Sequence, residues 1–292
     1  MTSVDHTERF APSPTGRLHL GHAFSAILAH DRARAAGGRF LVRMEDLDPS
    51  RVREEYYRGI LDDLDWLGLD WDGEVVCQSD RSALYEGALA RLTGLGLTYR
   101  CQCSRRDIAE AASAPQENAA AFGLDGPVYP GTCRDLAAPT ARPTAIRLHL
   151  RRAFEHLGGP DRVADLTVTE TGAPAGTAGL DPGRLIAGTG DIVLKRRDDA
   201  VAYHLAVVVD DAAQHVTHVT RGDDLRAAAP VQKLIQTLLG LPGVIYHHHR
   251  LIRDDDGKRL AKRHNALALG TLREDGATPA DIRRLVGLDG SL

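Results

Sequence analysis

The sequence is short of cysteine and of long apolar stretches. Its 292 residues include four cysteines, too few for a disulfide scaffold. No run approaches the roughly 20 apolar residues that cross a bilayer, and the first ten residues lack the apolar stretch of a secretory signal. These absences argue against disulfide-rich secreted proteins and membrane-spanning proteins. We therefore expect a cytoplasmic protein that binds no membrane.

An excess of one charge is also missing. The 36 basic and 40 acidic residues give a net charge of −4, which argues against a general polyanion-binding surface but allows a local basic patch. Lysine is also scarce: 32 of the 36 basic residues are arginine, and only four are lysine. The hydrophobic content of 43% and the charged content of 26% are ordinary for a globular protein, so the chain can bury a core in one large or two modest domains. The four lysines are Lys195, Lys233, Lys258 and Lys262.

Apolar periodicity predicts an α/β protein. The first elements read strand, helix, strand, which is the opening of a doubly wound fold, and Gly37-Gly38 ends the first helix. In chain order, the pattern predicts a strand ending at 9–11, a helix at 22–36, a buried strand within 40–48, helices at 53–67 and 82–95, buried strands at 201–211 and 216–219, a helix at 230–239 and a short helical element from 267.

The character of the sequence changes near Tyr99. Residues 101–143 are irregular and carry three of the four cysteines, and residues 144–195 read as strands interrupted by Gly and Pro. The simplest architecture is a Rossmann-like nucleotide-binding core split by an insertion. We divide the chain into the first half of the core (1–98), the insertion (99–190), the second half of the core (191–265) and a C-terminal helical element (266–292).

The motif His19-Leu20-Gly21-His22 stands where a Pro-rich loop enters the first helix. A helix N-terminus has free N–H groups and a partial positive charge, so it suits phosphate. Imidazoles can donate to phosphate oxygens there, and glycine allows close approach. Two surface histidines on a capped helix are the alternative, which the preceding APSPTG loop makes less attractive.

A second motif, KRLAKR at 258–263, follows the turn-forming run 254–257. A mobile basic loop can close over a polyphosphate and neutralise developing charge. A solvated charged loop is the alternative. The motif holds two of the four lysines, which favours a specific role.

Together these motifs resemble the two signatures of class I aminoacyl-tRNA synthetases, His-Ile-Gly-His and Lys-Met-Ser-Lys-Ser. The second differs from the family pattern at Arg259 and Ala261, while Lys262 keeps the principal charge. No G-x-G-x-x-G follows the first strand, which argues against a dinucleotide enzyme. The blocks RFAPSPTGRLHLGHA, LVRMEDLDPSR, AYHLAVVVDD and VTRGDDL are similar to the glutamyl and glutaminyl branch, in the family's order over about residues 9–265.

About 27 residues follow Asn265, too few for the anticodon-binding domain of a full glutamyl-tRNA synthetase. The chain therefore resembles the truncated paralogues, the glutamyl-queuosine tRNA(Asp) synthetases. That resemblance implies activation of L-glutamate with ATP and Mg²⁺, without tRNA, and then transfer of glutamate to the queuosine base in the anticodon of tRNA(Asp). We expect a monomer. The alternatives are a discriminating glutamyl-tRNA synthetase and a non-catalytic, zinc-containing RNA-binding paralogue.

The resemblance also implies site residues. Arginine binds carboxylates bidentately, and an acidic side chain suits an ammonium group, so Arg221 is expected on a carboxylate and Glu45 on the α-amino group. The alternatives are surface arginines, an exposed acid at a strand end and a core tyrosine. The implied catalytic residues are His19, His22 and Lys262, the ATP-binding residues are these three with Gly21, and the glutamate-binding residues are Arg9, Ala11, Ser13, Glu45, Tyr203 and Arg221.

Some nearby polar residues have simpler interpretations. Asp46 and Asp48 are read as structural or capping residues. The run His247–His249 looks like a metal tag, but we interpret it as surface between a strand and a loop.

Cys101, Cys103 and Cys133 lie within the insertion. Thiols two residues apart can face one metal but do not readily bond each other, and structural zinc takes four ligands. Spacing alone leaves Tyr129, His149 and Cys77 as candidates for the fourth ligand. The resemblance selects Tyr129, and Cys77 is interpreted as a small core residue. We therefore expect one structural Zn²⁺ per chain, with unligated buried thiols as the alternative.

Overall fold

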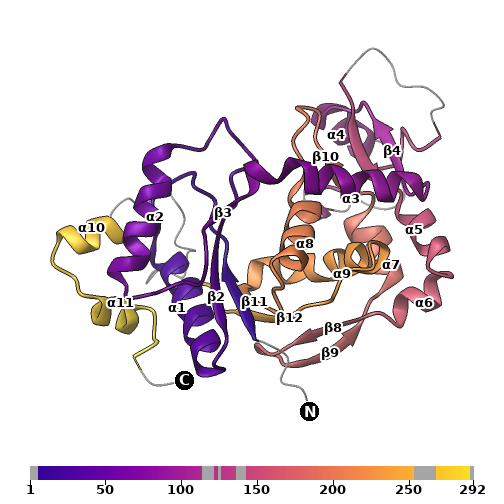
Figure 1. Cartoon of the computed structure of the whole chain (residues 1–292). Helices are drawn as coiled ribbons and strands as arrows, with labels where there is room; N and C mark the ends of the chain where they lie inside the picture. The colour runs from indigo at the N-terminus through magenta and orange to yellow at the C-terminus, as the bar shows by residue number, and fades with distance from the viewer. Residues whose placement is uncertain (1–5, 114–121, 124–125, 136–142, 253–267, 290–292) are drawn as a thin grey trace.

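Two hydrogen-bonded groups of largely parallel strands lie side by side at the centre of the structure and together act as one sheet (Figure 1). The computed structural model describes residues 6–113, 122–123, 126–135, 143–252 and 268–289. The strands of this sheet are β1 (Thr7–Phe10), β2 (Arg39–Met44), β3 (Val76–Cys77), β8 (Thr167–Glu170), β9 (Gly176–Gly179), β11 (His218–Gly222) and β12 (Ile245–His249).

Two groups of parallel strands make up this sheet. β1, β2 and β3 pair in that order, β11, β12 and β8 pair likewise, and β9 adds an antiparallel edge. The groups meet at β1 and β11, where the Thr217 N–H donates to the Thr7 carbonyl at 3.0 Å. The two halves of the core are thus joined by residues that lie 210 positions apart in the sequence.

Helices cover both faces of this sheet. The first face carries α1 (Leu20–Ala35), α2 (Glu54–Trp66), α10 (Leu269–Glu274) and α11 (Pro279–Leu285), which Figure 1 shows together. The side chains of β2 alternate between the two faces of the sheet: Phe40, Val42 and Met44 pack with α1, while Leu41 faces the opposite side. The other side carries α3 (Ser82–Gly94), α8 (Tyr203–Ala213) and α9 (Ala229–Leu238), with α8 packed between the other two.

A smaller antiparallel sheet lies mostly within the predicted insertion, but one of its three strands, Val193–Lys195, lies beyond the predicted end at 190. Its order is β10-β7-β4, formed by β4 (Thr98–Cys101), β7 (Ala145–Leu148) and β10 (Val193–Lys195). The insertion also contains α4 (Arg105–Ser113), α5 (Leu150–His156), α6 (Pro160–Ala164), α7 (Pro182–Arg184) and the two-residue strands β5 (Phe122–Gly123) and β6 (Gly126–Pro127). The β8–β9 hairpin belongs to the same stretch of sequence but pairs with β12 of the core. The division at 99 and 190 therefore stays a prediction about domains.

Three local predictions are wrong in whole or in part. Residues 144–195 were expected to form interrupted strands, but they also contain the helices α5, α6 and α7. Residues 201–211 were expected to form a buried strand, but most of them lie in helix α8. The helix is buried on every side, so its apolar run carries no periodicity, and its three consecutive valines favour a strand by propensity alone. The run His247–His249 was expected at the surface, but it lies in β12 with His248 only 2% exposed.

The other long elements agree with the sequence. The helices expected at 22–36, 53–67, 82–95 and 230–239 correspond to α1, α2, α3 and α9, and α10 and α11 form the short C-terminal helical element. None of the described helices is both long and apolar enough to cross a membrane.

Candidate active site

Both histidines of the first motif lie at the N-terminus of α1. His19 is the N-cap residue, and its Nδ1 accepts the Gly21 N–H at 3.1 Å. The His19 N–H donates to Nδ1 of His22 at 3.2 Å, and the two ring centroids are 3.8 Å apart. Because each Nδ1 is an acceptor, each neutral ring carries its proton on Nε2. The capping arrangement thus selects the tautomer that can donate through Nε2.

The basic motif at 258–263, including Lys262, Arg259 and Ala261, lies outside the described residues. The residues that flank it are described. Ile252 packs in the same apolar cluster as α1, and Ala268 forms a β-bridge with His19. The Leu269 N–H also donates to the Leu18 carbonyl at 2.9 Å. Both flanks of the segment therefore lie against the start of the first helix or its core.

Four of the six expected glutamate-binding residues come together around Tyr203. Burial raises the pKa of its hydroxyl, the positive charges of Arg221 and Arg9 oppose that shift, and Glu45 adds to it. Burial likewise raises the pKa of Glu45, against Arg43 and Arg9. Two cations and one carboxylate therefore lie close enough to Tyr203 to shift the pKa of its hydroxyl.

The remaining two expected residues, Ala11 and Ser13, lie in the loop between β1 and α1. The Ser13 carbonyl accepts the Thr15 N–H at 2.8 Å, and the preceding carbonyl, of Pro12, accepts the Glu45 N–H at 2.9 Å. This loop is therefore fastened to the end of β2, beside Glu45. Ser13 itself is exposed, and the structure describes no side-chain contact between it and the pocket.

Arg221 is buried, at 5% exposure, and is not a surface arginine. Its Nε donates to Nε2 of His248 at 3.0 Å, its Nη1 to Oε1 of Gln232 at 2.8 Å, and its Nη2 to the Leu225 carbonyl at 3.1 Å. Its guanidinium carbon lies 4.8 Å from the ring centroid of Tyr246. Every one of these partners is uncharged, so among the described residues this buried cation has no carboxylate.

Arg9 is also buried, but it is paired. Its Nε donates to Oδ1 of Asp211 at 3.2 Å, and the same oxygen accepts from Nη1 of Arg43 at 2.8 Å. Arg43 also reaches Glu45 at 3.4 Å. The neighbouring Asp210 accepts from Tyr85, Gln78 and Arg81 at 2.6–2.8 Å. A buried charge network thus supports the side of the pocket that holds Arg9 and Glu45.

Sequence reasoning missed this network. Arg43 interrupts the apolar run of β2 that follows Arg39, and it points to the α8 side because it alternates with Val42 and Met44. Asp210 and Asp211 close the apolar run of α8. A charge inside a buried strand and a pair of acids at the end of a buried run were the available signals, since fully buried charges are almost always paired. As expected, Asp46 and Asp48 hold local structure, through Ser79 and Ser50 respectively.

The three cysteines of the insertion form a cluster. The sulfur atoms of Cys101, Cys103 and Cys133 lie within 4.8 Å of one another. The Tyr129 hydroxyl lies 3.6 Å from Sγ of Cys103 and accepts the Cys133 N–H at 2.8 Å. Burial raises the pKa of Cys103 to about 11, and a cation among the three sulfur atoms would favour their thiolate forms. The donor set therefore fits a soft dication such as Zn²⁺.

The other two candidates for the fourth ligand lie outside this cluster. Nδ1 of His149 accepts the Arg152 N–H at the start of α5, and Cys77 packs against the apolar cluster of α1 and β2. Arg147 lies over the Tyr129 ring, 4.0 Å from its centroid, while burial and the neighbouring thiols raise the pKa of the Tyr129 hydroxyl, so its ionised form depends on a bound cation. The geometry therefore favours Tyr129 over both.

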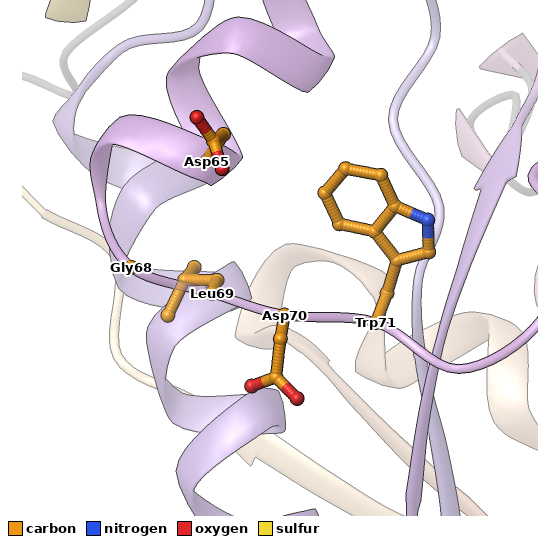
Figure 2. Close-up of a pocket in the computed structure, with 5 residues that line it drawn as sticks. All are labelled: Asp65, Gly68, Leu69, Asp70 and Trp71. Carbon is orange, nitrogen blue, oxygen red and sulfur yellow. The ribbon is translucent and has the colours of Figure 1, made fainter.

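A shallow pocket lies elsewhere, after α2 (Figure 2). Figure 2 shows the Asp70 carboxylate directed away from the Trp71 indole, and this carboxylate pairs with Arg34 and His30. None of the expected site residues that the structure describes lines this pocket. Its lining residues are Asp65, Gly68, Leu69, Asp70 and Trp71.

Comparison with known proteins identifies the family of this chain. Residues 6–150 and 176–291 match a family described as tRNA synthetases class I (E and Q), catalytic domain. The chain is 57% identical to glutamyl-Q tRNA(Asp) synthetase of Rhodobacter capsulatus, over 96% of this chain and 99% of that protein. It is 45% identical to the protein of the same name from Nocardia farcinica, over 95% of this chain and 82% of that one.

Solved structures share the fold. A glutamate tRNA ligase from Elizabethkingia meningosepticum, in complex with its amino acid, matches with a TM-score of 0.75 at 22% identity. A Mycobacterium tuberculosis methionyl-tRNA synthetase bound by methionyl-adenylate matches with a TM-score of 0.62 at 10% identity. Each comparison covers 97% of this chain, which spans 60% and 64% of those two proteins.

The chain therefore belongs to the class I tRNA synthetases for glutamate and glutamine, and it is a ligase. Within that family, the relatives described above carry the name glutamyl-Q tRNA(Asp) synthetase.

Proposed function

We propose that this protein activates L-glutamate with ATP, without tRNA, and then transfers the glutamyl group to the queuosine base in the anticodon of tRNA(Asp). The observation that carries the glutamate assignment is Arg221, a buried guanidinium whose partners among the described residues are all uncharged. A buried ion is costly without a counter-charge, and a substrate carboxylate supplies one. The names of the relatives support the queuosine assignment.

The amino-acid pocket suits the three charges of glutamate. Arg221 binds one carboxylate, Glu45 holds the α-amino group, and Arg9, Ala11, Ser13 and Tyr203 complete the wall. Burial keeps the pKa of the Glu45 carboxyl above its usual range, and an incoming ammonium favours its ionised form. Glutamine presents an amide in place of the carboxylate, so it loses the charge-assisted bonds to arginine.

The reaction needs positioning and charge stabilisation rather than a covalent enzyme intermediate. An oxygen of the glutamate α-carboxylate attacks the α-phosphorus of ATP, the bond to the leaving pyrophosphate breaks, and glutamyl adenylate forms. His19 and His22 donate to the phosphates through Nε2, Gly21 allows close approach, and Lys262 neutralises the leaving group. Mg²⁺ bound with ATP supplies further positive charge, and it usually keeps several waters and few protein ligands. A queuosine hydroxyl then takes the glutamyl group, and AMP leaves.

One structural Zn²⁺ is proposed in the insertion, held by Cys101, Cys103, Tyr129 and Cys133. These residues would supply three thiolates and a phenolate, which is a complete donor set for a structural zinc and would leave no ligand position for a substrate. The metal orders this part of the chain. The protein acts as a monomer, and its proposed substrates ATP and tRNA are cytoplasmic.

Two measurements test the function. ATP–pyrophosphate exchange should depend on glutamate and proceed with no RNA present; a requirement for tRNA would contradict the proposal, as would an absence of exchange, which a non-catalytic RNA-binding paralogue would show. Mapping the labelled nucleotide after incubation with queuosine-containing tRNA(Asp) should place glutamate in the anticodon. Labelling of the 3′ end would instead identify a glutamyl-tRNA synthetase.

A further inference from the structure

Three adjacent strands place Arg221, His248 and Glu170 in a row. His248 is the direct cross-strand partner of Arg221 in the β11–β12 pair, and β8 with Glu170 lies on the other side of β12. Nε2 of His248 accepts from Nε of Arg221 at 3.0 Å. Nδ1 of the same ring bonds to Oε2 of Glu170. The imidazole thus connects a buried guanidinium to a carboxylate on the far strand.

The proton positions in this row follow from the chemistry of arginine. A guanidinium only donates, so the His248 nitrogen that faces Arg221 must carry a lone pair. The proton of the neutral ring is therefore on Nδ1, where the Glu170 carboxylate accepts it. Burial lowers the pKa of His248 to about 4, against the opposing effect of Glu170, so the ring stays neutral at physiological pH.

Glu170 is itself fixed. Its Oε1 accepts the N–H groups of Gly172 at 2.6 Å and of His248 at 3.0 Å, and its Oε2 accepts from Arg226 at 3.0 Å. A Cβ at Gly172 would lie 2.3 Å from the His248 carbonyl and 2.9 Å from Oε1 of Glu170. The close approach of this turn to β12 therefore requires glycine, and the carboxylate has little freedom to turn away.

On the other side of the guanidinium, Gln232 is oriented by the same rule. The Gln232 atom 2.8 Å from Nη1 of Arg221 must be the oxygen, because arginine does not accept. With the Leu225 carbonyl on Nη2, three of the five N–H donors of Arg221 have partners among the described residues. The Nε–H is one of those three. The N–H donors that remain for a substrate carboxylate are therefore on the two terminal nitrogens, Nη1 and Nη2. A carboxylate that uses both binds end-on to the guanidinium.

We propose that His248, held in its Nδ1–H tautomer by Glu170, is a positioning residue that fixes Arg221 for end-on binding of the glutamate carboxylate. This inference rests on the proposed function, in which Arg221 contacts glutamate. His248 acts through Arg221 and touches no substrate. Its loss should therefore weaken glutamate binding while leaving ATP binding and the chemical step in place.

Pyrophosphate exchange with purified full-length variants tests the inference. His248→Phe removes the acceptor and should raise the KM for glutamate about 10- to 100-fold, the range expected for one lost hydrogen bond to a charged group. The KM for ATP and kcat should stay within about twofold of the unmodified protein. His248→Gln places an amide oxygen near the position of Nε2 and should recover most of the glutamate affinity.

His247→Phe is the matched control. His247 is the neighbouring residue of β12, it bonds to Thr171 rather than to Arg221, and its replacement should leave the KM for glutamate unchanged. Glu170→Gln supplies a second test should His248→Phe not fold. It removes the charge that fixes the tautomer and should raise only the KM for glutamate, by about 3- to 10-fold.

Equal KM values for glutamate in folded His248→Phe and His247→Phe would overturn the inference, as would equal losses in His248→Phe and His248→Gln. An unchanged KM in Glu170→Gln would also overturn it. Arg221→Leu separates this failure from that of the proposed function. If Arg221→Leu leaves the KM for glutamate unchanged, the pocket assignment itself is wrong; if only Arg221→Leu raises it, the pocket stands and the role of His248 does not.

Discussion

Replacing Asp211 tests the buried charge network that supports the proposed glutamate pocket. Oδ1 of Asp211 accepts from Nε of Arg9 at 3.2 Å and from Nη1 of Arg43 at 2.8 Å. Removing one partner of a buried ion pair costs about 3–5 kcal/mol, which is the loss in free energy of unfolding expected for Asp211→Ala. Asparagine can keep both hydrogen bonds, each contributing about 1 kcal/mol. Asp211→Asn should therefore lose about 1–3 kcal/mol.

Urea denaturation at pH 7 measures these losses. Asp198→Asn is a matched control, because Asp198 bonds to Arg196 at 2.6 Å but lies at the surface. Exposed ion pairs contribute at most about 1 kcal/mol, and this variant should fall at the low end of that range. A loss below about 0.5 kcal/mol for Asp211→Asn, the size of an ordinary surface substitution, would refute a stabilising role for the network.

The same variant predicts a pH dependence. Burial raises the pKa of Asp211, but the positive charges of Arg9 and Arg43 lower it by a larger amount. The folded-state pKa therefore lies below the usual value of 3.8. A carboxyl with a depressed folded-state pKa stabilises the fold fully above its unfolded pKa and loses that contribution as the pH falls through the folded value. The stability difference between the unmodified protein and Asp211→Asn should therefore be constant from pH 7 to about pH 5 and should shrink below about pH 4. A difference that grows in acid would contradict this assignment.

Three further predictions concern the reaction and the metal. Lys262→Ala should slow pyrophosphate exchange by about 100-fold or more, as the loss of one preorganised charge does; full activity would remove the basic loop from the site. Glutamate should be strongly preferred over glutamine, and Arg221→Leu should raise the KM for glutamate steeply; equal use of glutamine by the unmodified protein would contradict the pocket. Metal analysis should find about one zinc per chain, which Cys133→Ser should lose while the insertion becomes protease-sensitive; Tyr129→Phe should weaken zinc binding, and an unchanged zinc affinity would remove the phenolate and leave the three cysteines.

Helices and strands were predictable from the sequence where their apolar residues recur at a regular spacing and a glycine pair marks their boundary. Helix α1 has apolar residues at helical spacing and ends before Gly37-Gly38. Strand β2 is a short apolar run that starts just after those glycines. Helix α8 was not predictable in this way, because it is buried on every side and rich in valine, so neither periodicity nor propensity separates it from a strand.

The site was predictable only where a motif marks it. His19, His22 and Arg221 stand in blocks that resemble a known family. The local sequence also placed the two histidines at the start of a helix. His248 carries no such mark, since its role depends on the pairing of β8, β12 and β11 from distant parts of the chain. Long-range pairing of this kind cannot be read from local sequence, and the same limit hid the contact of Arg43 with Asp211.

The charges around the pocket explain why Arg221 is the residue to test for specificity. Arg9, Arg43 and Arg81 contact Asp210, Asp211 and Glu45 at 2.6–3.9 Å, so three cations offset three carboxylates. Arg221 stands outside this balance, held by a neutral imidazole, an amide oxygen and a backbone carbonyl. Glutamate carries a net charge of −1 and restores neutrality when it binds, whereas glutamine is neutral and leaves the buried guanidinium uncompensated. Discrimination therefore follows from using uncharged groups to orient Arg221, because a carboxylate in the position of His248 would satisfy the same N–H and remove the need for an anionic substrate.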